Sequence, residues 1–228
     1  MATRPILRPS KAPNLIIARP EYSQEQQELF KNQLRLYFTE VDNAWAAALG
    51  PNGLQYFEAP HIAASDSTDQ YATANNTPTV INWNTLYSGS GFTLQAPGSA
   101  IAQVAGIYKI TYSAQLVNTA NAEHDAVFWL KVNSVDVPNS ATIFTLPRRK
   151  SSGGPTYLAS YSEATFVVEA GDEVELYWAT DLAYNPVGPV DGVYIVHEPA
   201  WTVPPNLYER PAVPSVIGSI TFVSRRPT

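Results

Sequence analysis

The sequence has no cysteine, and only 15% of its 228 residues are charged. Without cysteine, neither a disulfide framework nor a cysteine-based zinc site can form, so packing and subunit association must stabilise the fold. The chain also lacks an apolar run long enough to cross a bilayer, and Arg4, Pro5, Arg8 and Pro9 interrupt its start. We therefore expect no signal peptide, no membrane partner and a protein that is made and kept soluble.

The residues that are abundant point to β-structure. Hydrophobic residues make up 45% of the chain, with 19 Pro and 13 Tyr but a single Met. This composition is typical of aromatic-rich strands joined by many turns, and it excludes a disordered chain. The length suits one large all-β domain with extensions, which is simpler than two small domains.

Charge is distributed unevenly along the chain. The net charge is −6, yet residues 1–20 hold Arg4, Arg8, Lys11 and Arg19 with no acid, which leaves −10 for the remainder. An acidic body repels phosphate, so we expect no nucleic-acid partner. Regularly spaced prolines predict that residues 1–22 form an extended arm. The arm is expected to lie in an acidic groove of another protein, with nucleic-acid binding and a solvated, disordered tail as the alternatives.

Apolar residues in this arm favour docking over solvation, because they are costly to leave in water. We predict that the arm attaches the protein to a larger particle. The candidate anchoring residues combine the cations with these apolar side chains and are Arg4, Ile6, Leu7, Arg8, Leu15, Ile16, Ile17 and Arg19.

Residues 23–50 contain the clearest helix signal. Ser23 and Gln26 form a capping box, and Gly50-Pro51 ends the pattern, which predicts a helix of roughly 39 Å over residues 24–49. Apolar residues recur at spacings of four and three, as in a coiled coil, at Phe30, Leu34, Tyr37, Val41, Ala44 and Ala48. Leu29, Leu36, Phe38 and Trp45 widen the apolar face, which favours a trimeric stalk. The alternative is a single amphipathic helix packed on its own head domain.

Residues 51–228 are expected to form the head domain. A first strand is predicted on Leu54–Phe57, followed by a polar turn at residues 63–69. From residue 106 apolar and polar residues alternate, and turn signals recur every 8–15 residues without helices between them, which indicates a β-sandwich. Residues 126–132 are apolar on both faces, as in a strand covered on two sides. The candidate core or interface residues are Tyr108, Tyr112, Phe128, Trp129, Leu130, Val174, Leu176 and Trp178.

Three segments of the head domain resemble a known superfamily. Residues 106–110, 128–133 and 168–176 are similar to strands of the complement globular-head and tumour-necrosis-factor superfamily. The similarity spans about residues 77–223. It implies a jelly roll of about ten strands that forms trimers through aromatic-rich faces. One departure is Asn133-Ser134, which stands where the usual hairpin has Asn-Gly, so the turn type stays open.

Further segments resemble virion proteins of tailed bacteriophages, notably head-fibre and tail-fibre proteins of marine and cyanobacterial phages. The segments that carry this resemblance are 113–116, 129–133, 138–140 and 170–172 in the head domain, and 32–38 and 42–45 in the helix, which is similar to an attachment helix. The resemblance implies a trimeric virion component and does not fix its location on the particle.

The sequence contains no recognisable motif of a catalytic or metal-binding site. Catalytic and zinc motifs need fixed spacings that its three histidines do not have, and its carboxylate pairs lack the ligand pattern of a calcium loop. Gly89-Ser90-Gly91 does not match a nucleophile elbow. We therefore predict no catalytic residue, no metal and no cofactor. The residues weighed were His61, His124, His197, Asp66, Asp69, Asp181 and Asp191.

The sequence thus predicts a non-enzymatic phage structural protein, assembled in the host cytoplasm and located in the virion. The first interpretation is a capsid decoration or head-fibre homotrimer, held to other virion proteins by residues 1–22. The alternative is a tail-fibre or receptor-binding protein that recognises host surface glycan. A basic loop, residues 148–154, either contacts an acidic protein or is solvated. Aromatic candidates for sugar stacking, which also suit a core or interface, are Trp83, Tyr87, Tyr157, Tyr184 and Trp201.

Overall fold

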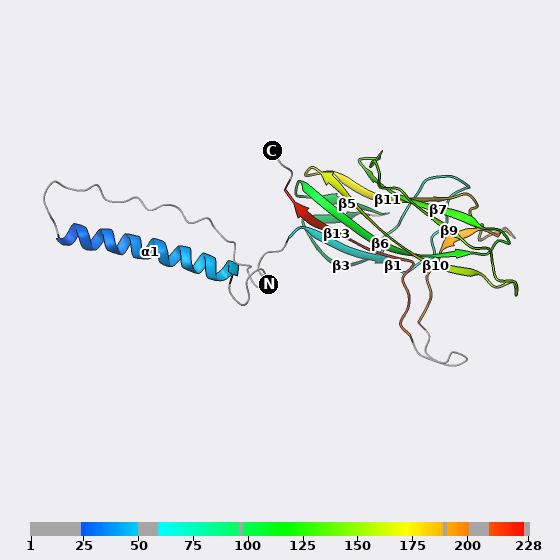
Figure 1. Cartoon of the computed structure of the whole chain (residues 1–228), viewed down its shortest axis with the longest axis horizontal. Helices are drawn as coiled ribbons and strands as arrows, with labels where there is room; N and C mark the ends of the chain where they lie inside the picture. The colour runs from blue at the N-terminus through cyan, green and yellow to red at the C-terminus, as the bar shows by residue number, and fades with distance from the viewer. Residues whose placement is uncertain (1–23, 50–58, 96–97, 189–190, 201–209, 226–228) are drawn as a thin grey trace. The chain divides into compact units, whose positions relative to one another are not determined.

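The computed structural model describes residues 24–49, 59–95, 98–188, 191–200 and 210–225, with side chains of the helix described to Trp45. The chain divides into two units, Met1–Glu58 and Ala59–Thr228. The second unit is called the sandwich (Figure 1). All of the candidate anchoring residues, from Arg4 to Arg19, lie outside the described residues, as do Leu54–Phe57.

The first unit contains one helix, α1 (Gln24–Leu49), at the position that the capping box and Gly50-Pro51 predict. Leu34, Tyr37, Val41 and Ala44 of the predicted stripe are half-buried, and Phe30 is 38% exposed. The side chain of Ala48 is not among those described. Apolar side chains on both flanks of the stripe are exposed, namely Leu29 (49%), Leu36 (63%), Phe38 (56%) and Trp45 (60%).

The sandwich contains thirteen described strands, of which three have only two or three residues. They are β1 (His61–Asp66), β2 (Thr79–Val80), β3 (Thr85–Ser90), β4 (Phe92–Gln95), β5 (Ser99–Ala102), β6 (Gly106–Asn118), β7 (His124–Val132), β8 (Val135–Asp136), β9 (Thr142–Leu146), β10 (Thr156–Val168), β11 (Glu173–Thr180), β12 (Val193–Ile195) and β13 (Val216–Ser224).

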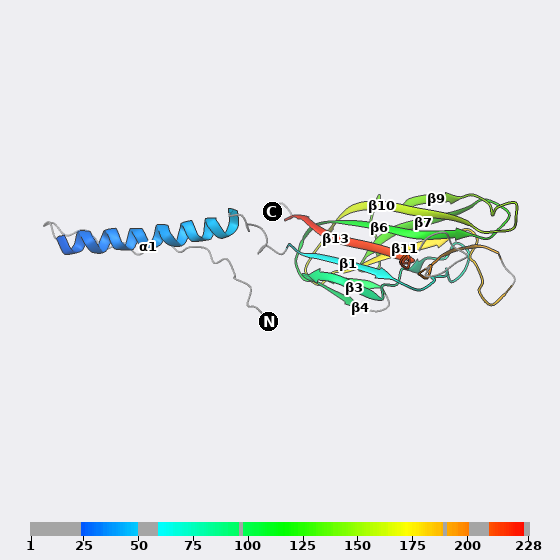
Figure 2. The same ribbon diagram turned by 90° about the horizontal axis from the view of Figure 1, so that it is seen from below.

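Two antiparallel sheets pack face to face (Figure 2). Sheet A has the order β10-β6-β13-β1-β3, with β12 beside β6, and sheet B has the order β4-β5-β11-β7-β8, with β2 on β11 and β9 on β7. Connections such as β5 to β6, β6 to β7 and β10 to β11 cross from one sheet to the other. This strand order is that of a jelly roll, two interlocked Greek keys. The predicted all-β jelly roll preceded by one helix is therefore confirmed.

The core lies between the sheets and follows the alternation seen in the sequence. On β6, Tyr108, Ile110 and Tyr112 point inward and are at most 3% exposed. Facing them from sheet B are the fully buried Phe128, Leu130, Leu176 and Trp178, together with Val174. Trp129 departs from this set, because it points away from the core and is half-buried on the outer face of sheet B.

The predicted turn at residues 63–69 is wrong in part, since β1 occupies residues 61–66. Ala64 faces the core, and the buried Asp66 is satisfied because its Oδ1 accepts the Thr68 N–H at 2.7 Å. The Asn133-Ser134 turn has φ of 50° and 65°. Both values are those of a type I′ hairpin, so serine occupies the position that glycine usually takes.

Candidate functional site

The outer face of sheet A carries several large side chains that remain exposed in the described sandwich. Because side chains alternate along a strand, the residues between the buried positions of β6, β10 and β13 point outward. We call this surface the sheet A face. Its exposed large side chains are Tyr87 (60%), Tyr157 (53%), Tyr161 (63%), Val167 (47%) and Ile217 (45%).

The centre of the sheet A face is hollowed into a shallow groove of about 250 Å³. Short side chains, among them Ala63, Ser113 and Ser219, line it on the central strands β1, β6 and β13. Tyr161 on β10 and Tyr87 on β3 stand on the flanking strands. Large rings beside a floor of small residues give a shape that accepts an apolar side chain from another molecule.

A row of tyrosines continues the sheet A face at one end. Tyr157, Val117 and Tyr194 lie directly opposite one another on β10, β6 and β12. Val117 is fully buried even though it points outward, which is consistent with cover by the two rings beside it. The Tyr194 ring also contacts Tyr184 and Tyr71, with centroids 4.8 and 5.5 Å away. Burial, followed by the nearby Asp69 charge, raises the pKa of Tyr194 to about 12, so its hydroxyl stays neutral.

One ion pair lies on the sheet A face, between Lys109 of β6 and Glu163 of β10. Its hydrogen bond lowers the pKa of the Glu163 carboxyl and raises that of the Lys109 ammonium. The Tyr161 hydroxyl lies 3.5 Å from Glu163 Oε2, and the Thr111 and Ser219 hydroxyls are 2.9 Å apart. These polar groups of the sheet A face are thus paired, whereas Val167 and Ile217 remain 47% and 45% exposed.

The outer face of sheet B also carries aromatic residues, and these contact side chains of the same sheet. Trp129 and Tyr177 are directly opposed on β7 and β11, with ring centroids 6.0 Å apart. Trp129 Nε1 donates to Asp136 Oδ1 at 2.8 Å, and Lys131 Nζ lies 4.7 Å from the Tyr177 centroid and 3.4 Å from the same Asp136 oxygen. Both rings are half-buried. This cluster is satisfied within a single chain.

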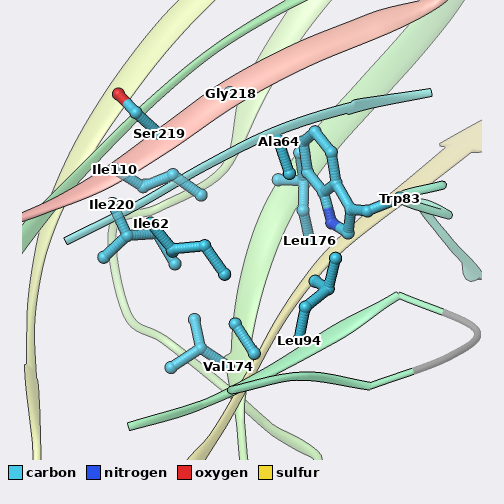
Figure 3. A pocket seen from close by; sticks show the side chains of 11 residues that line it. Ile62, Ala64, Trp83, Leu94, Ile110, Val174, Leu176, Gly218, Ser219 and Ile220 are labelled. Carbon is cyan, nitrogen blue, oxygen red and sulfur yellow. The ribbon is translucent and has the colours of Figure 1, made fainter. Parts of the chain in front are cut away.

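An internal cavity lies between the sheets, among residues of β1, β6 and β13 from sheet A and of β4, β5 and β11 from sheet B (Figure 3). Trp83 and Leu94 lie on one side, and Ile62, Ile110 and Ile220 lie on the other. Trp83 fits here because Gly218 has no side chain, since a Cβ at that position would approach Trp83 Cη2 to 2.9 Å. The free space is only about 30 Å³ with an apolar lining, which suits neither an organic ligand nor ordered water.

The residues considered for chemistry are dispersed. His124 Nδ1 lies 3.0 Å from Asp181 Oδ2, whereas His61 and His197 face the backbone carbonyls of Ala59 and Val213. Among the described residues, no group of three His, Cys, Asp or Glu side chains could hold a metal ion. Across the same part of the chain, no helix is long and apolar enough to span a membrane.

The structure distributes the aromatic candidates among different environments. Tyr87 and Tyr157 lie on the sheet A face, Tyr184 lies in the tyrosine row, and Trp83 borders the internal cavity. Trp201 lies outside the described residues. Sequence reasoning missed Tyr161 and Ile217. Their alternation with the buried Ser160 and Val216 could have revealed both.

Comparisons with known proteins return structural similarity only. No protein-family model matches the chain, and no curated protein matches its sequence. Among solved structures, the chain is similar to the globular domain of the zebrafish complement 1qA protein, with 13% identity, a TM-score of 0.42 and coverage of 74% of this chain and 100% of that domain. It is also similar to Eiger TNF from S. frugiperda, with 12% identity, a TM-score of 0.44 and coverage of 74% and 96%.

Proposed function

We propose that this protein is a non-enzymatic structural subunit that forms a homotrimer through the sheet A face and through α1. The observation that carries the proposal is the set of five large side chains that the sheet A face leaves 45–63% exposed. Full burial of such a side chain contributes about 1.5–3 kcal/mol, which association would recover. Large exposed side chains gathered on one face around a groove are typical of a protein interface.

Three copies fit the helix better than two. Its flanks at Leu29, Leu36, Phe38 and Trp45 extend the apolar surface on both sides of the coiled-coil stripe. A two-stranded seam would leave these flanks in water, whereas a third helix can cover more of them. The helix and the sheet A face would then support the same trimer.

We place the trimer in the virion of a tailed phage, as a capsid decoration or head-fibre protein attached through residues 1–22. The support is the segment-level resemblance to virion proteins and the basic, apolar composition of the arm. Three arms on one trimer would bind a particle together, since each attached arm raises the effective concentration of the other two.

Removal of residues 1–20 tests this placement. The truncated protein should remain a folded trimer in solution and should be absent from purified particles. Incorporation at the level of the full chain would contradict anchoring by the arm, and a truncated protein that sediments as a monomer would instead implicate the arm in assembly.

A second candidate function is that of a tail-fibre or receptor-binding protein that recognises host glycan. The observation that favours it is the basic loop between β9 and β10, which contains Arg148, Arg149 and Lys150 and precedes the exposed Tyr157.

A further inference from the structure

A band of polar side chains crosses the sheet A face from one edge strand to the other. It consists of two adjacent rows, in which residues on β10, β6, β13, β1 and β3 lie directly opposite one another. Figure 2 shows these strands side by side in this order. We call these residues the polar band, although Ala63 is apolar, and its rows are Thr165, Lys109, Thr221, His61 and Ser90, and Glu163, Thr111, Ser219, Ala63 and Ser88.

Large exposed side chains lie on both sides of the polar band. On β10, Tyr161 lies on one side and is 63% exposed, and Val167 lies on the other side and is 47% exposed. The distance along the strand between these two residues is roughly 20 Å. A standard interface buries about 800 Å² per partner, which is wide enough to span this distance. A subunit contact that covers both residues therefore also covers the polar band between them.

The ion pair in the polar band has hydrogen-bonding capacity that the sandwich does not use. Lys109 Nζ contacts Glu163 Oε2, and the Tyr161 hydroxyl lies 3.5 Å from the same oxygen. An ammonium group has several N–H donors, and a carboxylate accepts at both oxygens. Among the described residues, Glu163 Oε1 and the remaining Lys109 donors have no partner. The two side chains are 53% and 39% exposed, so water can reach these groups in a lone subunit.

Association through the sheet A face removes this water. A buried charge or hydrogen-bonding group without a partner is costly, and the attraction within an ion pair offsets only part of the cost. A neighbour that presented only apolar side chains to Lys109 and Glu163 would therefore bind weakly. A neighbour that presented hydroxyl, amide or backbone groups would replace the lost water.

We infer that a neighbouring copy of this chain covers the polar band with hydrogen-bonding groups of its own, and that the Lys109–Glu163 pair lies inside the subunit contact. The inference rests on the proposed trimer contact and adds the chemistry that the neighbour presents there. Apolar groups of the neighbour then lie beside Tyr161 and Val167, on either side of the polar band. Because apolar and polar zones alternate along the strands, a shifted neighbour would place apolar groups on the ion pair, so the polar band selects one register.

Association constants of full-length variants, measured by sedimentation over a range of concentrations, test the inference. The variants E163Q and K109Q each leave one covered charge without its partner and should weaken association by about tenfold or more. The variant K109Q/E163Q leaves no charge and keeps amides that can form hydrogen bonds, so it should associate within about threefold of the unchanged protein. Both side chains are partly exposed in the subunit, so all three variants should fold, and unfolding midpoints check this.

The variant K109M/E163L tests the chemistry of the neighbouring copy. It also removes both charges, but its side chains cannot form hydrogen bonds with the neighbour. Association should therefore be weaker than that of K109Q/E163Q by about tenfold. The matched control is D136N, which breaks the Lys131–Asp136 pair on sheet B and should associate as the unchanged protein does.

Three results would overturn the inference and leave the proposed trimer in place. The first is association of E163Q and K109Q that equals that of D136N. The second is a loss in K109Q/E163Q that equals the combined losses of the single variants, since the two residues would then act independently. The third is tighter association of K109M/E163L than of K109Q/E163Q. A monomeric unchanged protein would instead overturn both the proposed function and the inference.

Discussion

The two outer faces of the sandwich both carry aromatic residues, yet they differ in how those residues are satisfied. On sheet B, the Trp129 indole donates to Asp136, and Lys131 lies against the Tyr177 ring. On sheet A, Tyr161 and Ile217 are 63% and 45% exposed beside an open groove. The difference teaches that exposure alone does not identify an interface. Large side chains that stay exposed around an open groove indicate a partner in another chain.

The largest effect is expected from introducing a carboxylate on one face or the other, and the affinity between subunits is the quantity that should differ. The variant I217D should separate the subunits, because an unpaired carboxylate would be buried in the association, and we expect affinity to fall by at least roughly 30-fold. The variant I143D alters a sheet B residue that is 64% exposed and should leave assembly unchanged. Sedimentation over a range of concentrations measures both. Equal dissociation of the two variants would remove the distinction between the faces.

The layer beneath the sheet A face should affect folding of the subunit. Replacing Gly218 by valine forces Trp83 out of the internal cavity, since even a Cβ would approach its Cη2 to 2.9 Å. Overpacking of this kind costs about 1–3 kcal/mol in the free energy of unfolding. The variant G89A is the control, because its nearest neighbour would be 3.7 Å away. Chemical denaturation should show destabilisation for G218V only, and similar losses in both would contradict the assigned role of Trp83.

Lowering the pH should change the stability contributions of Glu163 on sheet A and Glu175 on sheet B in opposite directions. The hydrogen bond from Lys109 lowers the pKa of Glu163 below 4.5 on sheet A, whereas burial and then the Glu173 charge raise the pKa of Glu175 above 4.5 on sheet B. The Glu163 contribution to stability is present above about pH 4.5 and is lost as pH falls through its lowered pKa. The burial of charged Glu175 instead opposes folding at higher pH, and this penalty is relieved as pH falls through its raised pKa.

The variants E163Q and E175Q separate these two contributions. Relative to the unchanged protein, E163Q should lose stability near neutral pH and little under acid conditions, whereas E175Q should gain stability near neutral pH. Thermal unfolding midpoints measured from pH 3 to 8 would show the two trends. Shifts of the same sign in both variants would contradict the assigned environments.

The smallest effect is expected from the sheet B cluster. The variant D136A removes the acceptor of Trp129 Nε1 and the partner of Lys131, both near the surface. Such exposed interactions contribute about 0–1 kcal/mol, so unfolding should shift slightly and the oligomeric mass should not change. Loss of assembly in D136A would show that sheet B also forms a subunit contact.

Local patterns predicted the regular elements well. The capping box and the Gly50-Pro51 stop gave the bounds of α1, and alternation gave the buried sides of β6 and β11. The strand β1 was missed because Ser65 and Asp66 read as turn residues. Both residues lie in a buried strand because β1 pairs with β13 and because Asp66 accepts hydrogen bonds from Thr68 and Ser215. The sequence around residues 65 and 66 does not indicate these partners.

The candidate interface was harder to predict than the fold. Trp129 and Phe128 are adjacent and equally apolar in sequence, yet one points outward and the other is fully buried. The tyrosine row depends on β12 lying beside β6, which places Tyr194 next to Tyr157 across Val117. Such neighbours follow from topology, so no pattern within a single segment reveals them.

The mass of the intact protein in dilute solution tests the central claim most directly. Sedimentation equilibrium at micromolar concentration should give three times the 24.9 kDa of one chain, because burial of the sheet A face stabilises the assembly. A well-folded protein that sediments at 24.9 kDa under the same conditions would contradict the account.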